Sequence, residues 1–351
     1  VSDTRLNYKA ARDTLEKVRV ALAKNVSTES SNPKTFRILD KKTVTKEMGA
    51  GINLGNTMDG GLYDSSETGW QAYKTTKDYI KALHDAGYNT VRIPVTWGSH
   101  INDDYTIDEA WINRVQEIVD YCVDQDMYAI VNIHHDGAAN HDDRGNNTPA
   151  CWLDTYSQNI EKVYQKYEGV WNTIANRFKD YDEHVIFESM NEVTDAHGTA
   201  TNEDDAVLNA LNQLFINTVR ATGSNNTKRW LAITGRFATT AAITTMPEDT
   251  LADSGDLGTT RLMFAVHIYK SNNNVRWSYD DLKQWQSSMS SSYKNVGNLD
   301  VNMPIYVGEY GVRTKAQNGS ATGYNNAERA LNYEMCAAIA DFYNAVPVVW
   351  D

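Results

Sequence analysis

Two glutamates stand at the ends of apolar segments, where their carboxyl groups could carry acid–base chemistry. The segment VIFESMNEVTD, residues 185–195, begins as a buried strand should and runs into Asn191 and Glu192. The segment PIYVGEYG, residues 304–311, contains Glu309 near its end. Two carboxyls on facing strands suit glycoside hydrolysis, in which one protonates the leaving oxygen and the other attacks the anomeric carbon or activates a water. Glu192 and Glu309 are therefore candidate catalytic residues.

Further segment ends carry side chains that could bind a sugar or tune these carboxyls. They supply Arg92, His134, His267, Tyr269 and Trp350. An Arg and a Tyr that hydrogen-bond Glu309 would keep its carboxylate ionised. A setting with fewer cations would leave Glu192 protonated at rest, so that the two carboxyls differ in charge. Asn191, an amide beside the acid, could hold a sugar 2-hydroxyl.

Eight short apolar segments alternate with longer segments of helical periodicity. The expected strands lie near residues 50–54, 89–94, 127–133, 185–190, 230–234, 262–267, 304–308 and 346–350. Most segments between them place apolar residues on one helical face, as in 111–122 and 207–215. With no composition break after residue 40, this α/β alternation predicts a single (β/α)8 TIM barrel over residues 35–351. Such barrels carry their chemistry at the carboxyl ends of the strands.

A doubly wound open sheet is the main alternative to the barrel. Such folds usually carry a glycine-rich phosphate loop that opens a helix after the first strand. In GAGINLG, residues 49–55, the glycines instead lie before and inside the expected strand. The barrel is therefore the preferred fold.

The composition is that of an acidic globular protein. The chain has 351 residues, 41% of them hydrophobic, and a formal net charge of −13. Nucleic acids and anionic membranes need a basic face, so we expect neither as a partner. The 9 Trp and 20 Tyr suit the flat faces of sugars. The three cysteines show no pairing pattern and no metal spacing, so a disulfide framework is not expected.

The motifs, taken as an ordered set, resemble those of glycoside hydrolase family 5, within the clan of retaining (β/α)8 glycosidases. The stretches NLGNTMD, VRIPVTW, NIHHD and NE, then HIY, GEYG and the final Trp, are similar to its endoglucanase-rich branch. The resemblance implies that Glu192 is the general acid/base and Glu309 the nucleophile. It implies a surrounding polar shell and an aromatic floor made of Arg92, His134, Asn191, His267, Tyr269 and Trp350.

Several neighbouring residues each allow two interpretations. His134 matches the family position, whereas His135 could face the loop. Trp97 and Trp152 are candidate sugar-binding platforms, and each could equally pack a loop. The remaining open cases are Asp136, a loop cap or a sugar contact; Arg92, a site residue or a structural one; and Glu188, which we expect to be structural.

The stretch HHDGAANHDDRGNN, residues 134–147, gathers possible metal ligands, including His141, Asp142 and Asp143. Zinc sites need ligands that are fixed in space, whereas the Gly, Ala and Asn here predict a mobile loop. The Asp and Asn oxygens would suit Ca²⁺. We expect no catalytic metal and no cofactor.

These residues allow three functions from different classes. The first is a retaining endo-β-1,4-glucanase acting on cellulose, mixed-linkage β-glucan or xyloglucan, with a mannanase or xylanase on the same scaffold as the alternative. A metal-dependent hydrolase would need a His or carboxylated Lys cluster across several strand ends, which the sequence lacks. A non-catalytic carbohydrate-binding barrel would lack a carboxylate, and both are present. We therefore expect a polysaccharide as partner and a monomer that is secreted, at the cell surface or periplasmic.

The two ends of the chain carry expectations of their own. The apolar stripe of residues 8–22 and the polar linker 25–34 predict an extra N-terminal helix and linker over residues 1–34. The sequence stops at VPVVWD, where family members usually continue into a closing eighth helix. A parallel strand needs cover on its outer face. We hypothesise that residues 4–24 supply that cover, in this molecule or a neighbour; the alternative is a tail helix.

Overall fold

The computed structural model describes residues 35–60, 66–137, 151–155, 159–194, 202–240, 246–250, 252, 260–269, 283, 287–292, 294–295, 303–311 and 326–350. The predicted N-terminal helix and linker, residues 1–34, lie outside the described residues. The hypothesis that residues 4–24 cover the groove between the last strand and the first therefore concerns residues outside the described ones.

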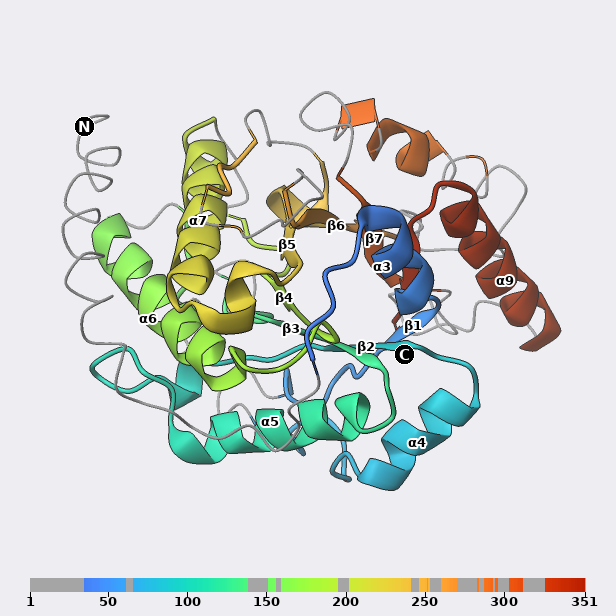
Figure 1. The fold of residues 1–351 in the computed structure, drawn as a ribbon, viewed down its shortest axis with the longest axis horizontal. Helices are drawn as coiled ribbons and strands as arrows, with labels where there is room; N and C mark the ends of the chain where they lie inside the picture. Colours follow the sequence, from blue (N-terminus) through green and yellow to red (C-terminus); the bar gives the residue numbers. More distant parts are fainter. Residues whose placement is uncertain are drawn as a thin grey trace.

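Eight parallel strands close into a barrel in chain order, with β1 hydrogen-bonded to β8 (Figure 1). They are β1 Gly51–Asn53, β2 Thr90–Ile93, β3 Tyr128–Asn132, β4 Val185–Glu188, β5 Leu231–Ile233, β6 Leu262–Ile268, β7 Ile305–Tyr310 and β8 Val346–Val349. Each falls within or beside an apolar segment predicted as a strand. The (β/α)8 barrel is confirmed.

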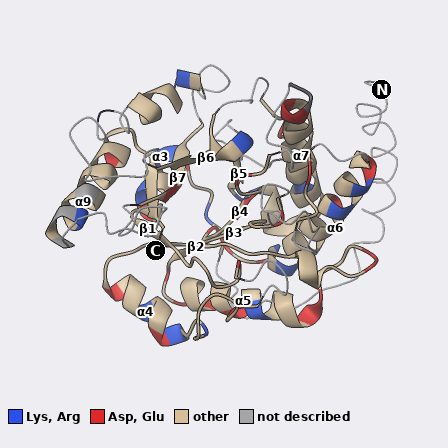
Figure 2. Cartoon of the chain, turned by 180° about the vertical axis from the view of Figure 1, so that it is seen from behind, with Lys and Arg blue, Asp and Glu red and all other residues tan. Residues whose placement is uncertain are grey.

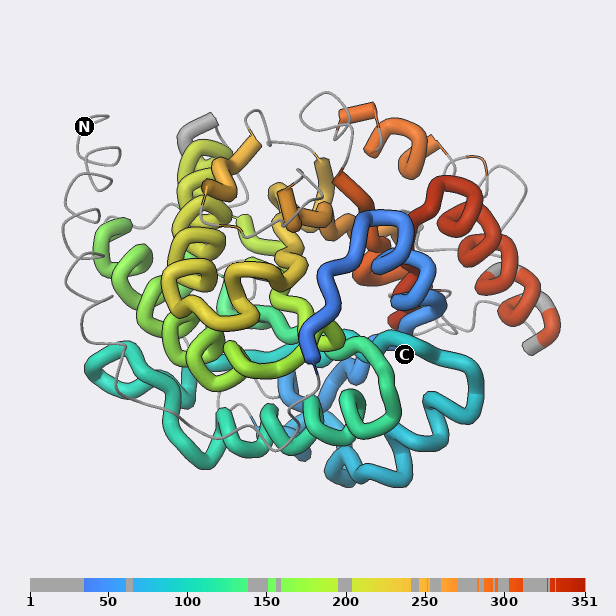
Figure 3. Tube along the Cα trace, viewed as in Figure 1, coloured from blue at the N-terminus to red at the C-terminus, as the bar shows by residue number. Residues whose placement is uncertain are grey.

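Amphipathic helices pack around the strands, and Figure 3 shows them following one another in sequence colour. They are α4 Lys77–Asp85, α5 Glu109–Val123, α6 Ile160–Phe178, α7 Asn202–Ala221 and α9 Asn326–Phe342, with the short 3₁₀ helices η2 Gly98–His100, η4 Ser224–Thr227 and η5 Arg236–Ala238. Side-chain caps fix the starts of two of them. Thr76 caps α4 by accepting from the Tyr79 N–H, and Asp108 caps α5 by accepting from the Trp111 N–H.

The apolar residues form two cores, one between strands and helices and one inside the barrel. A short helix, α3 Lys41–Met48, closes the inner core at the end where the strands begin. Its buried residues Val44 and Met48 pack with Tyr128, Ile186 and other side chains at the strand starts. The strands finish at the opposite end of the barrel.

Charges of both signs cover the outside. Figure 2 shows Lys and Arg interspersed with Asp and Glu along α4, α5 and α6. Among the described residues, no helix is long and apolar enough to span a bilayer. The three cysteines, 122, 151 and 336, are buried and unbridged.

Candidate active site

A bulge in β7 turns Glu309 into the open end of the barrel. The register between β6 and β7 pairs His267 with Glu309, so Gly308 is an extra residue in β7. Bulges of this kind often re-aim a side chain beside an active site. A Cβ on Gly308 would lie 3.0 Å from Tyr306 Cε2 and 3.2 Å from His267 Nε2. Glycine at this position therefore makes room for His267 beside Glu309.

Two donors hold the Glu309 carboxylate. Arg92 Nη1 donates to Oε1 at 2.9 Å, and the Tyr269 hydroxyl donates to Oε2 at 2.9 Å. Burial, together with the charge of Glu309, raises the pKa of Tyr269, so this hydroxyl keeps its proton and remains a donor. These are the Arg and Tyr contacts expected from the sequence, and both stabilise an ionised carboxylate.

Arg92 links Glu309 and Asn191 to the strands around them. Its guanidinium donates twice to Glu188, at 2.8 and 3.0 Å, and also to Asn53 Oδ1 and Asn191 Oδ1. Burial would lower the pKa of Arg92, but the charges of Glu188 and Glu309 outweigh it and hold the pKa well above its usual value. Arg92 has no exposed surface. It therefore positions Glu309 and Asn191, and its complete burial favours the structural interpretation of Arg92.

His267 lies between the two catalytic candidates. Its Nδ1 is 2.7 Å from Glu192 Oε1 and 3.7 Å from Glu309 Oε2. A carboxylate oxygen of Glu192 and one of Glu309 lie within 4.8 Å of each other. Enzymes that retain the anomeric configuration hold their carboxyls about 5–5.5 Å apart, whereas inverting enzymes need about 6.5–9.5 Å to admit a water. Oxygens this close are compatible with the shorter separation, at which one carboxylate attacks directly.

The electrostatic setting of Glu192 differs from the one expected. Burial raises the pKa of Glu192, but the hydrogen bond with His267 and the charges of His267 and Arg92 outweigh it and hold the pKa below its usual value. The prediction that Glu192 rests protonated in a cation-poor setting is therefore wrong for the free site. Its side chain is 41% exposed, so a bound sugar would change its solvation.

His134 and Trp350 form a wall of the open end. The Asn132 amide faces His134 Nδ1 at 3.2 Å, and its oxygen accepts from the Val95 N–H. This network assigns Nδ1 as the acceptor and leaves the proton on Nε2. Burial holds the pKa of His134 well below its usual value, so the ring is neutral. The Trp350 ring lies nearly parallel to it, at 5.7 Å and 13°. The pair offers a ring face and an N–H donor to a sugar.

The family model for cellulases of glycosyl hydrolase family 5 matches residues 52–351 of this chain. The chain belongs to glycoside hydrolase family 5. It is thus a glycoside hydrolase whose substrate is a polysaccharide.

Named relatives and solved structures agree with this family 5 assignment. Endoglucanase A of Paenibacillus barcinonensis is 33% identical over 346 residues, which cover 90% of this chain and 83% of that protein. The family 5 xyloglucanase from Paenibacillus pabuli superimposes with a TM-score of 0.76 at 33% identity, covering 88% of this chain and 90% of that one. A GH5-4 broad specificity endoglucanase from Ruminococcus champanellensis with bound cellotriose gives a TM-score of 0.75 at 32% identity, covering 91% of each chain.

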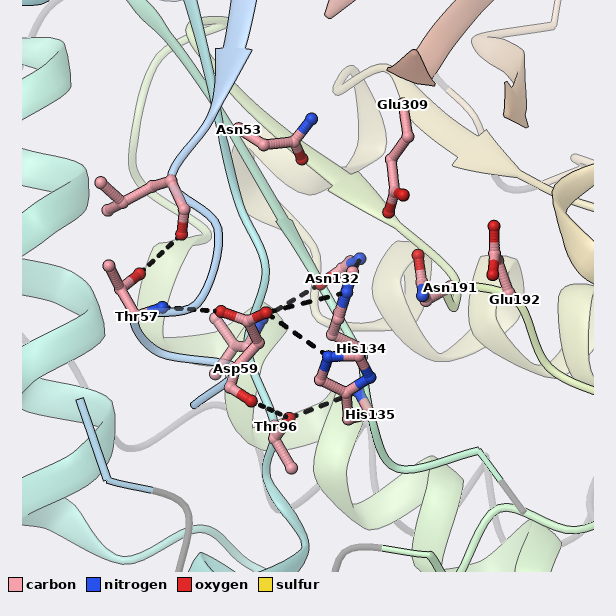
Figure 4. A network of polar contacts seen from close by, with 12 residues as sticks. Asn53, Thr57, Asp59, Thr96, Asn132, His134, His135, Asn191, Glu192 and Glu309 are labelled. Atoms are coloured by element: carbon pink, nitrogen blue, oxygen red, sulfur yellow. Dashed lines mark hydrogen bonds and ion pairs between the residues drawn. The ribbon is translucent and has the colours of Figure 1, made fainter. Parts of the chain in front are cut away.

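The family 5 site also contains residues that the sequence did not single out. Asp59, in the loop after β1, is fully buried and accepts from the Thr57 N–H at 2.8 Å. Its Oδ2 lies 3.5 Å from His135 Nε2 and 4.0 Å from His134 Nε2. Figure 4 shows Asp59 on one side of His134, with Glu192 and Glu309 on the other. NLGNTMD contains Asp59, but nothing in its spacing indicated that the carboxyl meets residues after β3.

Two groups of described residues have ligand atoms close enough to hold a metal ion. They are Asp59, His134 and His135, and Glu192, His267 and Glu309. The first group does not fit, because the His134 nitrogen that faces Asp59 carries a proton. The second group contains the two candidate catalytic glutamates and His267, which lies between them. The loop that holds His141, Asp142 and Asp143 lies outside the described residues.

The structure corrects one proposed sugar platform and gives the other a loop-packing role. Trp97 is fully buried, and its indole N–H donates to the Asn132 carbonyl at 2.8 Å. Trp152 is half-buried, its indole N–H donates to Asp136 Oδ1 at 2.6 Å, and the Lys166 ammonium lies 4.8 Å from its ring centre. Asp136 also accepts from the Trp97 backbone N–H at 3.0 Å. Burial raises the pKa of Asp136 to about 6. It anchors two loops and is not exposed to a sugar.

Proposed function

We propose that this family 5 enzyme is a retaining endo-β-1,4-glucanase that cleaves cellulosic and mixed-linkage glucans and accepts xyloglucan. The short separation of the Glu192 and Glu309 oxygens, within 4.8 Å, carries the proposal. Endoglucanases among the relatives, and a xyloglucanase and broad specificity endoglucanases among the structural neighbours, support the substrate class.

The first half of the proposed reaction forms a glycosyl-enzyme. The Glu309 carboxylate, held by Arg92 and Tyr269, attacks the anomeric carbon of the sugar that lies against Trp350. Glu192 gives its proton to the glycosidic oxygen, which leaves with the remainder of the chain as an alcohol. A sugar over Glu192 covers its exposed part, and this desolvation favours the neutral acid that the step needs.

The second half releases the sugar with its original configuration. Glu192, now a carboxylate, takes a proton from a water whose oxygen attacks the anomeric carbon. The bond to Glu309 breaks, and its carboxylate returns to the two donors. The Asn191 amide, oriented by Arg92, is placed to bind the 2-hydroxyl in both halves.

A panel of purified polysaccharides with product sizing tests the substrate class. We expect rapid loss of viscosity and mixed oligosaccharides from mixed-linkage glucan, soluble cellulose and xyloglucan, with or without a chelator. A Glu309→Gln variant is the control and should leave every polymer intact. Cleavage confined to mannan or xylan would assign this family 5 chain to a different polysaccharide.

We also propose that the enzyme works outside the cytoplasm as a monomer. β-Glucan polymers are too large to cross a membrane, so the enzyme must act on them outside the cytoplasm. Cell fractionation with an activity assay, followed by light scattering of the purified protein, tests both statements. Activity confined to the cytoplasm, or a stable dimer, would contradict them.

A further inference from the structure

Three side chains of the types that bind metals converge at the ends of three different strands. Glu192, His267 and Glu309 offer ligand atoms that all lie within 4.8 Å of one another. Glu192 follows β4, while His267 lies in β6 and Glu309 in β7, so closure of the barrel brings them together. One imidazole nitrogen with two carboxylate oxygens suits Zn²⁺ and related divalent transition metals. The three residues therefore have the composition of a three-ligand metal site.

The separations among these atoms fit a single small ion. His267 Nδ1 lies 2.7 Å from Glu192 Oε1 and 3.7 Å from Glu309 Oε2. Ligand atoms around a tetrahedral zinc lie about 3.3–3.6 Å apart, because each is about 2.0–2.2 Å from the metal. The two observed distances fall on either side of this range. The Glu192 side chain is 41% exposed, so it has room for the small movement that an ion requires.

His267 is able to bind a metal through Nδ1. A neutral imidazole ligates with one nitrogen and carries its proton on the other. The Nε2 atom of His267 is buried and makes no hydrogen bond to any described residue, so no partner prevents the proton from residing there. Nδ1, which faces both carboxyl groups, is then left for the ion. The metal takes the place of the hydrogen bond between His267 and Glu192.

The charges around these three residues favour a dication. Arg92 is the guanidinium of this network, and it is shared between Glu188, at 2.8 Å, and Glu309, at 2.9 Å. Together with Glu192, the network holds three carboxyl groups for one guanidinium. A divalent cation would offset the surplus of negative charge and would become the largest local charge in the site.

The other group of close ligand atoms provides an internal comparison. Asp59, His134 and His135 also lie within 4.8 Å of one another. The Asn132 contact leaves the proton of His134 on Nε2, the nitrogen that faces Asp59, so this nitrogen is not free to ligate. Figure 4 shows Asp59 and His135 across His134 from the two glutamates. A variant in this second group therefore separates one metal site from the other.

We propose that Glu192, His267 and Glu309 form an inhibitory site for Zn²⁺ and other divalent transition metals. The ion engages both carboxyl groups, so Glu309 is not free to attack and Glu192 has no proton to give. The inhibition rests on the proposed function, because it requires that these glutamates carry the reaction, whereas the metal binding does not. Mg²⁺ and Ca²⁺ take about six to eight oxygen ligands, so neither should occupy the site.

Metal binding is tested in the absence of substrate. Calorimetry with Zn²⁺, and the visible absorption of Co²⁺ as a spectroscopic substitute, should show an ion whose binding depends on Glu192. Glu192→Gln keeps the size of the side chain and removes a carboxylate ligand. Affinity should fall at least about tenfold, since even residues that only support a ligand contribute about 10–100-fold. His267→Ala should lose as much.

Asp59→Asn, in the other group, is the matched control for these titrations and should bind the metal like the parent. Unchanged affinity in Glu192→Gln overturns the proposal. So does a loss confined to Asp59→Asn, or a parent protein that binds no Zn²⁺.

Kinetics test the consequence for catalysis. Zn²⁺ should raise KM for an aryl β-cellobioside without changing kcat, because the ion and the sugar compete for the same carboxyl groups. The inhibition constant should match the dissociation constant from calorimetry. A chelator should restore the parent rate, and Mg²⁺ at the same concentration should have no effect. Inhibition that lowers kcat and leaves KM unchanged overturns the proposal.

Failure of the metal site and failure of the proposed function give different results. Full activity at a Zn²⁺ concentration that saturates the protein overturns the proposal while leaving the glucanase activity intact. Conversely, Glu192-dependent metal binding by a protein that cleaves no glucan would contradict the proposed function and support the metal site.

Discussion

His267 couples the two carboxyls of the site, and its contacts explain what single residues could and could not reveal in advance. Glu192 and Glu309 were recognisable because each follows an apolar run. The charge state of Glu192 was not, because its partner His267 lies 75 positions away and the contact depends on closing the barrel. The burial of Trp97 could not be predicted from the sequence either, since a Trp at a strand end packs against a loop as readily as it binds a sugar.

The hydrogen bond from His267 should set the pH dependence of the enzyme. The general acid must be protonated, so kcat/KM falls as pH rises through the pKa of Glu192 in the free enzyme. His267 lowers that pKa. His267→Ala removes this effect, the pKa rises, and the alkaline limb of the kcat/KM profile should move to higher pH. Tyr269→Phe, which leaves the Glu192–His267 contact in place, is the control. An unmoved limb in His267→Ala would contradict the assignment.

Removal of Glu192 should discriminate between leaving groups. A general acid typically contributes about 10²–10⁴-fold to the rate. Glu192→Ala should lose that factor on natural glucans and much less on aryl glycosides with acidic phenols, which depart without protonation. The ratio of kcat/KM values for the two substrate types gives the answer. Equal losses would show that Glu192 is not the acid.

At the scale of elements, the strands were predictable and the detail that aims Glu309 was not. Alternating apolar segments marked all eight strands, because a parallel barrel buries each of them on both faces. The sequence VGEYG does not show that β7 carries an extra residue relative to β6, because register is decided by the partner strand. Helix α3 was also missed, since KKTVTKEM holds only two apolar residues that become buried.

Gly308→Ala tests the role of the bulge. The new methyl would lie 3.0 Å from Tyr306 Cε2 and 3.2 Å from His267 Nε2, so one of the rings must move. Overpacking of this kind typically costs about 1–3 kcal/mol of stability. We expect a modestly lower melting temperature and a larger fall in kcat, because His267 loses its place between the carboxyls. A crystal structure of the variant should show His267 displaced; full activity would mean that the bulge tolerates a side chain.

At the scale of the molecule, the barrel separates a sealed end from a working end. Helix α3 closes the end where the strands begin. Arg37, which precedes this helix, forms ion pairs with Glu47 at 2.9 Å and with Glu183. The candidate catalytic residues stand at the other end, across the interior layer that holds Arg92 and Glu188. The fold class could be predicted from the alternation of strands and helices, whereas the closure of the barrel by α3 is visible only in three dimensions.

The closure of the barrel by α3 should contribute to stability and not to catalysis. Met48 is fully buried in the inner core, so Met48→Ala should cost about 2–5 kcal/mol. In a domain this large, each kcal/mol lowers the melting temperature by roughly 2–4 °C. Calorimetry should record this loss while kcat/KM at 25 °C stays at the parent value. A fall in kcat/KM without a change in melting temperature would contradict the separation of the two ends.

The central claim is that Glu309 attacks the sugar directly, with Glu192 as acid and then base. Proton NMR during the first minutes of hydrolysis of an aryl β-cellotrioside distinguishes the two anomers before they interconvert. The short carboxyl separation predicts that the β-anomer appears first and the α-anomer only later, through mutarotation. Initial release of the α-anomer would mean that a water attacks instead, and would contradict the role assigned to Glu309.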